Sequence, residues 1–519
     1  MATQRNGFKK ESFILSVDVG TTTIRCNVFD KGAKIRGTCS SKVNYFPSSM
    51  LFIHATKSPY AGVKMSQIVS LGIATQRGTF TTWDRTTGRP FHNFISYQDL
   101  RAIDSVTSWN GSYTMKAVQG AMTLLYLVSR QKRFLAASVL VFSPQQVTFR
   151  LLWALTHYTQ LRQAVAEDTC CFGTIDTWLL FKLTKGEVHA TDYSNASSTG
   201  MFDPYQMCWS GPLFSMLSLP FSILPKVEDT IHSFGSTHSS IFGVSIPIMA
   251  LIADQQAAMY GECCFDVGNV NITMGTGAFV DINTGSKPHT SAAGLYPVVG
   301  WKIGEEVVYL AEGNAADTGT AIKWAQGLEL FSDVQETSAM AYSVADSDGV
   351  CFVPSFSGLQ APLNDPTACA SFMGLTPSTN KCHLVRAILE SVAFSVRQLY
   401  QTMLRETCIP VTKIRVDGGV CTNDFVMQLT TDLIGQKLAR PVHHEISCRG
   451  AAFVAGLGVG FWKDKEELKR LHTADQMFVP RQAAQSGTEL GVVSAEYEAV
   501  LRSWEKALQR SMGWYSSRA

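Results

Sequence analysis

Several residues near the start of the chain combine types that suit phosphate binding. They are Asp18, Gly20, Thr21, Thr22, Thr23 and Arg25. Glycine permits a tight backbone turn, and the amide and hydroxyl groups that follow it can surround phosphate oxygens. A carboxylate just before such a turn can hold a hydrated Mg²⁺ ion. The alternative interpretation is a hairpin turn with threonines on the surface.

A second Gly-Thr turn consists of Gly275, Thr276 and Gly277. Its amide groups could face phosphate in the same way, although an ordinary hairpin tip is the alternative. The two Gly-Thr pairs begin at positions 20 and 275, about half of the 519-residue chain apart. This spacing favours two similar halves that face each other.

Two further turns follow predicted strands. Asp254 comes directly after an apolar run, where a carboxylate can act as a general base or, alternatively, as a helix N-cap. Gly418 and Gly419 follow another predicted strand, and a diglycine at such a place lets a flat ring approach the backbone. Asn423 could then bond the edge of a purine or ribose; an ordinary strand-to-helix turn is the alternative.

Strands must position these turns, and helices must cover the strands. Phe13–Asp30 and Val270–Gly285 each predict a β-hairpin with a Gly-Thr tip. Apolar spacing predicts helices over 383–404, 451–462 and 463–471. Strands that alternate with helices indicate an α/β fold with layered sheets and helices.

Composition excludes several classes of protein. Hydrophobic residues make up 45% of the chain and the net charge is +2, so no global field attracts nucleic acid. The longest apolar runs are far shorter than the roughly 20 residues that cross a bilayer. The polar N-terminus predicts no secretory signal, and the thirteen cysteines without a CxxC pair predict reduced thiols. We therefore expect a cytoplasmic protein.

Longer strings resemble the FGGY family of carbohydrate kinases, in the actin/hexokinase-type ATPase superfamily, and within it the glycerol kinases. They are FGTIDTWLLFKLTKGEVHATDYSNASSTGMFD, ADQQAAMYGE, MGTG, FVPSFSGLQAPLNDP and RVDGGVCTNDFVMQ. The resemblance implies two ribonuclease H-like α/β domains, 11–262 and 263–519, around a central cleft. It also implies ATP-dependent phosphorylation of glycerol to sn-glycerol 3-phosphate.

The resemblance further implies a role for each matching position. The nucleotide would be held by Gly20, Thr21, Thr22, Thr23, Arg25, Gly275, Thr276, Gly277, Gly319, Gly419 and Asn423. The polyol would contact Arg77, Asp254, Gln255 and Phe279. Asp254 would be the catalytic base, and Asp18 and Asp254 would hold Mg²⁺. The expected partners are ATP and a small polyol, and we expect no binding of nucleic acid. Assembly into a homo-oligomer is left open.

The chain departs from the family pattern mainly at the polyol end. Gly78 stands where glycerol kinases have a glutamate after the arginine, Tyr97 replaces a tryptophan, and Lys323 replaces a glutamine. These differences leave two alternatives open: a kinase for another small polyol or sugar, and a nucleotide-binding regulatory protein with weak turnover.

Residues 48–61 are another departure, because the family carries there a longer segment followed by an amphipathic helix. Our hypothesis is an alternative or misassembled exon. A harmless local deletion is the alternative.

Overall fold

The computed structural model of the protein describes most of the chain. The described ranges are 11–43, 63–291, 293–443, 446–472, 476–481 and 495–515. The shortened stretch 48–61 lies outside these ranges, so its hypothesis stays untested.

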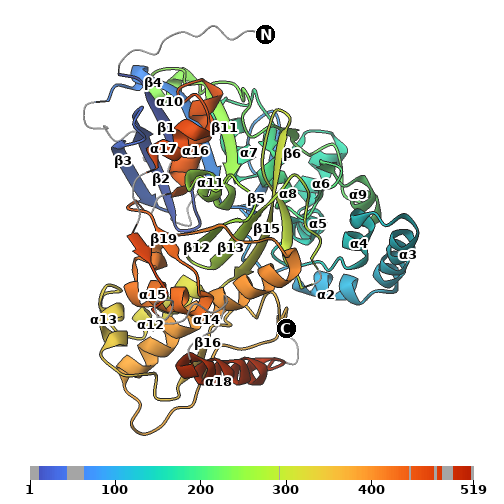
Figure 1. The fold of residues 1–519 in the computed structure, drawn as a ribbon. Coiled ribbons are helices and arrows are strands. Elements are labelled where there is room, and N and C mark those ends of the chain that lie inside the picture. Colours follow the sequence, from blue (N-terminus) through green and yellow to red (C-terminus); the bar gives the residue numbers. More distant parts are fainter. Residues whose placement is uncertain are drawn as a thin grey trace.

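The N-terminal half is built on a five-stranded mixed sheet (Figure 1). The strand order is β3 (Ile35–Lys42), β2 (Thr23–Phe29), β1 (Phe13–Val19), β4 (Ile68–Thr75) and β11 (Ile248–Ala253). The first three strands are antiparallel, whereas β4 and β11 run parallel to β1. The carboxyl ends of β1, β4 and β11 therefore meet at one edge of the sheet.

The C-terminal half repeats this arrangement in a seven-stranded sheet. The order is β14 (Tyr296–Ile303), β15 (Glu306–Ala315), β13 (Ala278–Gly285), β12 (Asn269–Met274), β18 (Lys413–Asp417), β19 (Leu438–Arg440) and β20 (Gln476–Phe478). Strands β15, β13 and β12 are antiparallel neighbours, and β18 and β19 continue parallel to β12. The prediction of two related α/β halves is confirmed, as are both predicted hairpins, β1–β2 and β12–β13.

The predicted helices are present with shifted ends. They are α14 (Lys381–Thr407), α16 (Ile446–Gly458) and α17 (Lys465–Leu471). The prediction that the middle helix reaches residue 462 is wrong. Gly460 turns the chain at a φ of +73°, and Trp462 folds back so closely that a Cβ on Gly456 would lie 2.3 Å from its ring.

Helix α16 comes late in the sequence but packs on the first sheet and on α11 (Asp254–Gly261). Glycine makes this contact possible, since a Cβ on Gly450 would lie 1.8 Å from the backbone oxygen of Ala257. The segment between β19 and β20 of the second sheet therefore helps to fix α11, which begins at Asp254.

A mostly helical region extends from the first sheet at the right of Figure 1. Its elements are β5 (Phe80–Asp84), α2 (Ile103–Gly111), α3 (Tyr113–Ser129), α4 (Lys132–Ser138), α5 (Val147–His157), α6 (Thr159–Ala166), β6 (Cys170–Thr174) and α9 (Gly211–Leu217). Phe80, Phe149 and Phe172 lie at the centre of its core. In the described part of the chain, no helix is both long and apolar enough to cross a membrane.

The remaining elements connect these parts. They are η1 (Met65–Gln67), α7 (Ile175–Leu183), β7 (Ala190–Asp192), α8 (Tyr193–Ser197), β8 (Phe202–Asp203), β9 (Cys208–Trp209), β10 (Lys226–Glu228), α10 (Ser239–Phe242), α12 (Thr318–Gly327), α13 (Glu336–Tyr342), β16 (Cys351–Val353), β17 (Ser371–Met373), η2 (Gly419–Thr422), α15 (Asp424–Ile434) and α18 (Ala495–Ser511).

Candidate active site

One cavity of about 1270 Å³ is lined by residues of both sheets. Every site residue predicted from the sequence lines it: Asp18, Gly20, Thr21, Thr22, Thr23, Arg25, Arg77, Asp254, Gln255, Gly275, Thr276, Gly277, Phe279, Gly319, Gly419 and Asn423. The structure thus brings the separate motifs together at one place. Their individual roles stay predictions.

The first Gly-Thr turn forms the tip of the β1–β2 hairpin. The Gly20 amide donates to the carbonyl oxygen of Thr23 at 3.0 Å, which closes the turn. The Thr21 hydroxyl donates to the Oε1 atom of Gln76 at 3.2 Å, and Gln76 follows directly on β4. A neighbouring strand therefore holds the turn, and its threonines line the cavity.

The second Gly-Thr turn is attached to the start of α12. The amides of Gly319 and Thr320 donate to the carbonyl oxygen of Thr276 at 2.9 and 3.1 Å. A Cβ on Gly319 would lie only 2.3 Å from the backbone oxygen of Gly275. Because of this close approach, the turn and the start of α12 are held together as one unit in the cavity wall, and phosphate binding by this turn stays a prediction.

The diglycine turn joins β18 to α15. A Cβ on Gly419 would meet nothing within 4 Å, so this backbone is open to a flat ligand. Asn423 lines the cavity, but its Oδ1 accepts from the amide of Val426 at 3.1 Å and its Nδ2 donates to Thr337 at 2.9 Å. The side chain caps α15, and a contact of Asn423 with the nucleotide stays a prediction.

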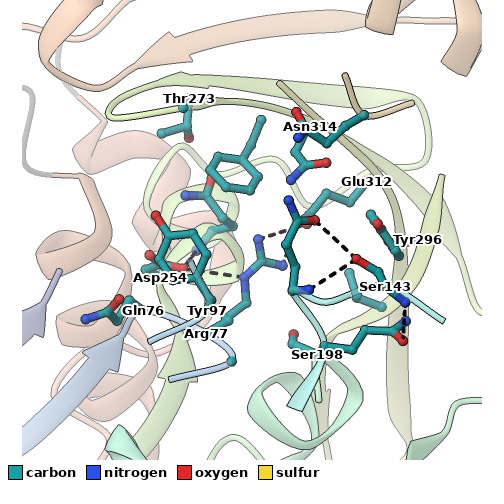
Figure 2. Close-up of a pocket in the computed structure, with 18 of the residues that line it drawn as sticks. Gln76, Arg77, Tyr97, Ser143, Ser198, Asp254, Thr273, Tyr296, Glu312 and Asn314 are labelled. Carbon is teal, nitrogen blue, oxygen red and sulfur yellow. Dashed lines mark hydrogen bonds and ion pairs between the residues drawn. The ribbon is translucent and has the colours of Figure 1, made fainter. Parts of the chain in front are cut away.

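Arg77 lies among the residues predicted to contact the polyol, with its side chain directed into the cavity (Figure 2). Its two terminal nitrogens donate to both carboxylate oxygens of Glu312 at 2.5 and 2.8 Å, and its Nε lies 3.6 Å from Asp254. Its guanidinium lies 5.4 Å from the centre of the Phe279 ring. Burial lowers the pKa of Arg77, but the carboxylates of Glu312 and Asp254 outweigh it and raise that pKa. Arg77 is therefore a fixed cation.

Asp254 is the first residue of α11 and follows β11. The N-cap alternative is not observed, because Ala253 occupies the cap position and Asp254 is the first helical residue, whose Oδ1 accepts from the adjacent Gln255 amide at 2.8 Å. Burial raises the pKa of Asp254 to about 6, while the neighbouring Arg77 cation opposes this rise. The carboxylate is thus mostly ionised at neutral pH and more basic than an exposed aspartate.

Asp18 and Asp254 are carried by the two strands that flank β4. Asp18 pairs in register with Ala74 of β4, and Ala253 pairs with Thr75. Two strand spacings and two residues along the chain separate them, so their backbones are roughly 12 Å apart. Aspartate side chains at this backbone separation could hold one hydrated Mg²⁺ between them, partly through its water shell, and this role stays a prediction. In the ranges that the structure describes, no three His, Cys, Asp or Glu residues cluster as a complete metal site.

Glu312 and Asn314 line the cavity and were not identified from the sequence. Both lie near the end of β15, and Asn314 Oδ1, like Gln255 Oε1, is buried without a hydrogen-bond partner in the structure described. The signal in the sequence was a carboxylate within the strongly apolar string VVYLAEGNA. Asp417 also lines the cavity, and burial raises its pKa to about 7.

The glycine at position 78 is built into the wall of the polyol end. Gly78 has a φ of +67°, and a Cβ there would lie 3.4 Å from the carbonyl oxygen of Gln145. The buried Arg150 donates to the carbonyl oxygens of Gly78 and Gln145 at 2.8 and 2.6 Å. The left-handed backbone disfavours a side chain, so position 78 supplies no carboxylate to the substrate.

Comparisons with known proteins agree with this geometry. The model of the FGGY family of carbohydrate kinases matches residues 13–261 with its N-terminal domain and 270–459 with its C-terminal domain. The division at 262/263 is close to these limits, but no separate observation tests it and it stays a prediction.

Among curated relatives, "Glycerol kinase 5" of Danio rerio is 67% identical over 99% of this chain and 100% of its own length. "Glycerol kinase 2" of Thermotoga maritima is 36% identical over 97% of this chain and 99% of its own. Among solved structures, the glycerol kinase of Plasmodium falciparum with ADP superposes with a TM-score of 0.81 at 28% identity, covering 96% and 98% of the two chains. The fold has the actin/hexokinase-type ATPase architecture, and the chain belongs to the FGGY family of carbohydrate kinases.

Proposed function

We propose that the protein transfers the γ-phosphoryl group of ATP to a terminal hydroxyl of glycerol and releases sn-glycerol 3-phosphate and ADP. The observation that carries the proposal is the placement of Asp254 beside Arg77 and Phe279, in the same cavity as two amide-rich turns. The relatives that bear the name glycerol kinase support the choice of glycerol. We propose the same division into domains, 11–262 and 263–519, and a cytoplasmic location.

Each group in the cavity has a step to perform. The Asp254 carboxylate accepts the proton of the attacking hydroxyl as the new O–P bond forms and the bond from the γ-phosphorus to ADP breaks. Arg77 donates to a second hydroxyl, and the open Gln255 and Asn314 oxygens accept from others. Phe279 packs against the carbon chain of the polyol. Positioning of this kind supplies much of the catalysis in phosphoryl transfer.

The nucleotide belongs at the opposite end of the cavity. The threonines and backbone of the turns at Gly20 and Gly275 line the cavity and would bind the β- and γ-phosphates, and the open backbone at Gly419 would leave room for the adenosine. The solved glycerol kinase of Plasmodium falciparum is a complex with ADP, which supports an adenine nucleotide as a ligand of this protein. Mg²⁺ would be held by Asp18 and Asp254 together with phosphate oxygens and water, and it would neutralise charge on the transferred group.

Gly78 favours a second candidate, a kinase for another small polyol or sugar. A glutamate at position 78 would accept a hydrogen bond from one substrate hydroxyl, and the glycine leaves that hydroxyl without this acceptor. The loss of one polar contact costs about 1–3 kcal/mol of binding free energy. We expect the absence of this carboxylate to weaken glycerol binding and to admit a larger acceptor beside Tyr97 and Gln145.

Release of ADP by the purified protein, measured with glycerol and with a panel of four- to six-carbon polyols and sugars, tests both candidates. Glycerol is expected to give the highest kcat/KM. A higher value for another polyol selects the second candidate. A folded protein that binds ATP but turns over none of these acceptors contradicts the proposal and supports a regulatory nucleotide-binding role.

A further inference from the structure

Helix α3 presents large apolar side chains to solvent. Tyr113, Leu124, Leu127 and Val128 are exposed by 90%, 66%, 53% and 86%, and Leu125 by 43%. Met115 is the one residue of this 17-residue helix that is buried. Scattered exposed apolar residues are ordinary, whereas several on one helix mark an interaction surface. We call these five residues the outer face of α3.

The outer face lies at the periphery of the molecule. Figure 1 shows α3 and α4 at the far right, beyond the helices that pack around the first sheet. Helix α4 packs against α3, and the segment after it exposes Val139 and Val141. The apolar surface therefore lies on a projecting helical pair, where a flat partner could reach it without meeting the rest of the protein.

The same region is basic although the whole chain is almost neutral. Ser105–Ala166 contains no aspartate or glutamate, whereas the whole chain has 42 acidic against 44 basic residues. The basic residues of this stretch are Lys116, Arg130, Lys132, Arg133, Arg150 and Arg162. Lys116, Arg130 and Lys132 are exposed. An apolar surface with cations beside it, and with no carboxylate on α3 or α4 themselves, is complementary to an anionic, apolar partner.

We propose that α3 docks the enzyme on the surface of an anionic lipid bilayer. The helix would lie in the plane of the interface, with its leucines among the acyl chains and the cations at the phosphate headgroups. A symmetric pairing of two copies through α3 would instead bring the same cations together. At 17 residues, about 26 Å of helix, α3 is too short to span the membrane and is suited to lying on it.

Docking would place the cavity close to the lipid. Arg133 of α4 and the exposed Val139 and Val141 also line the cavity that holds the candidate active site. The surface that meets the membrane is thus continuous with the rim of the cavity. This proposal goes beyond the phosphorylation of glycerol and does not depend on it.

Flotation of the full-length protein with vesicles tests the proposal. The probes are vesicles of phosphatidylcholine alone and vesicles with about 30% phosphatidylserine. Each surface cation is expected to raise the binding constant for the anionic vesicles by about fivefold. We expect flotation with the anionic vesicles and loss of it at high salt. The triple variant Leu124→Ser, Leu127→Ser, Val128→Ser should weaken binding at least tenfold. A double variant, Arg130→Gln with Lys132→Gln, should weaken it by about twenty-five-fold, from two such contributions.

A matched control changes exposed apolar residues elsewhere. Leu328→Ser with Leu375→Ser alters side chains that are 54% and 58% exposed in the other half, and it should bind vesicles as the wild type does. ATP-dependent thermal stabilisation of every variant checks the fold without relying on turnover.

Three results would overturn the proposal. One is a folded wild-type protein that ignores anionic vesicles. Another is equal flotation of the triple variant and the wild type. The third result combines two measurements. Sedimentation would show that the wild type self-associates and the triple variant is monomeric, and flotation would show that neither protein binds vesicles. The outer face would then join two copies of the chain.

Discussion

Replacement of Gly319 by alanine should impair ATP binding through a steric clash with the second Gly-Thr turn. The added Cβ would lie 2.3 Å from the backbone oxygen of Gly275, where ordinary contact begins at 3.4 Å. The turn or the helix must therefore move by about 1 Å, and such overpacking costs about 1–3 kcal/mol. The amides of Gly319 and Thr320 that hold Thr276 would be displaced by the same movement.

If this cost falls on the phosphate-binding geometry, the Kd for MgATP rises by roughly tenfold to a hundredfold. Isothermal titration calorimetry with MgATP measures the effect directly. Gly327→Ala is the matched control, because Gly327 ends the same helix and a Cβ there meets nothing within 4 Å. We expect the control to bind ATP normally. ATP affinity of Gly319→Ala equal to that of the wild type would refute the assignment of this turn to phosphate.

Three further predictions follow from the same geometry. The pKa of Asp254 is about 6, and the base acts when it is deprotonated. The kcat/KM for glycerol should therefore be level above pH 7 and fall tenfold per pH unit well below pH 6. A profile that is flat down to pH 5 would contradict this. Glu312→Gln should raise the KM for glycerol about tenfold, through looser placement of Arg77, and leave the KM for ATP nearly unchanged; steady-state kinetics checks this. Gly450→Ala should lower the temperature of thermal unfolding, since its Cβ would lie 1.8 Å from a backbone oxygen of α11, whereas Gly120→Ala, with nothing within 4 Å, should not.

Local patterns in the sequence were sufficient to predict both hairpins and three helices, the latter with shifted ends. The Gly-Thr tips separate two β-rich runs, and Asp464 caps α17 by accepting from the amide of Glu467. The packing of α16 on the first sheet was not predictable, because it joins segments that are far apart in the chain. The close approach of Gly450 explains it only after the fold is known.

The sequence predicted residues that line the candidate site, but it did not predict their hydrogen-bond and ion-pair partners. The family resemblance assigned Arg77 to the polyol, yet its bidentate partner Glu312 is 235 positions away and belongs to the other sheet. Asn423 was expected to face the nucleotide, and the structure shows its amide engaged in capping α15. Local sequence cannot distinguish such competing uses of one side chain, because the partners are assembled by the fold.

The most direct test of the proposed kinase compares two buried aspartates. Glycerol-dependent formation of ADP and glycerol 3-phosphate is measured for the wild type, Asp254→Asn and Asp281→Asn. Asp281 lies buried on β13, and burial and the neighbouring Glu312 raise its pKa; asparagine has nearly the same size and shape as this side chain. Asp254→Asn removes the base and should lower kcat by about 10²- to 10⁴-fold, whereas Asp281→Asn should stay within about threefold of the wild type. Full glycerol turnover by a folded Asp254→Asn protein would contradict the account.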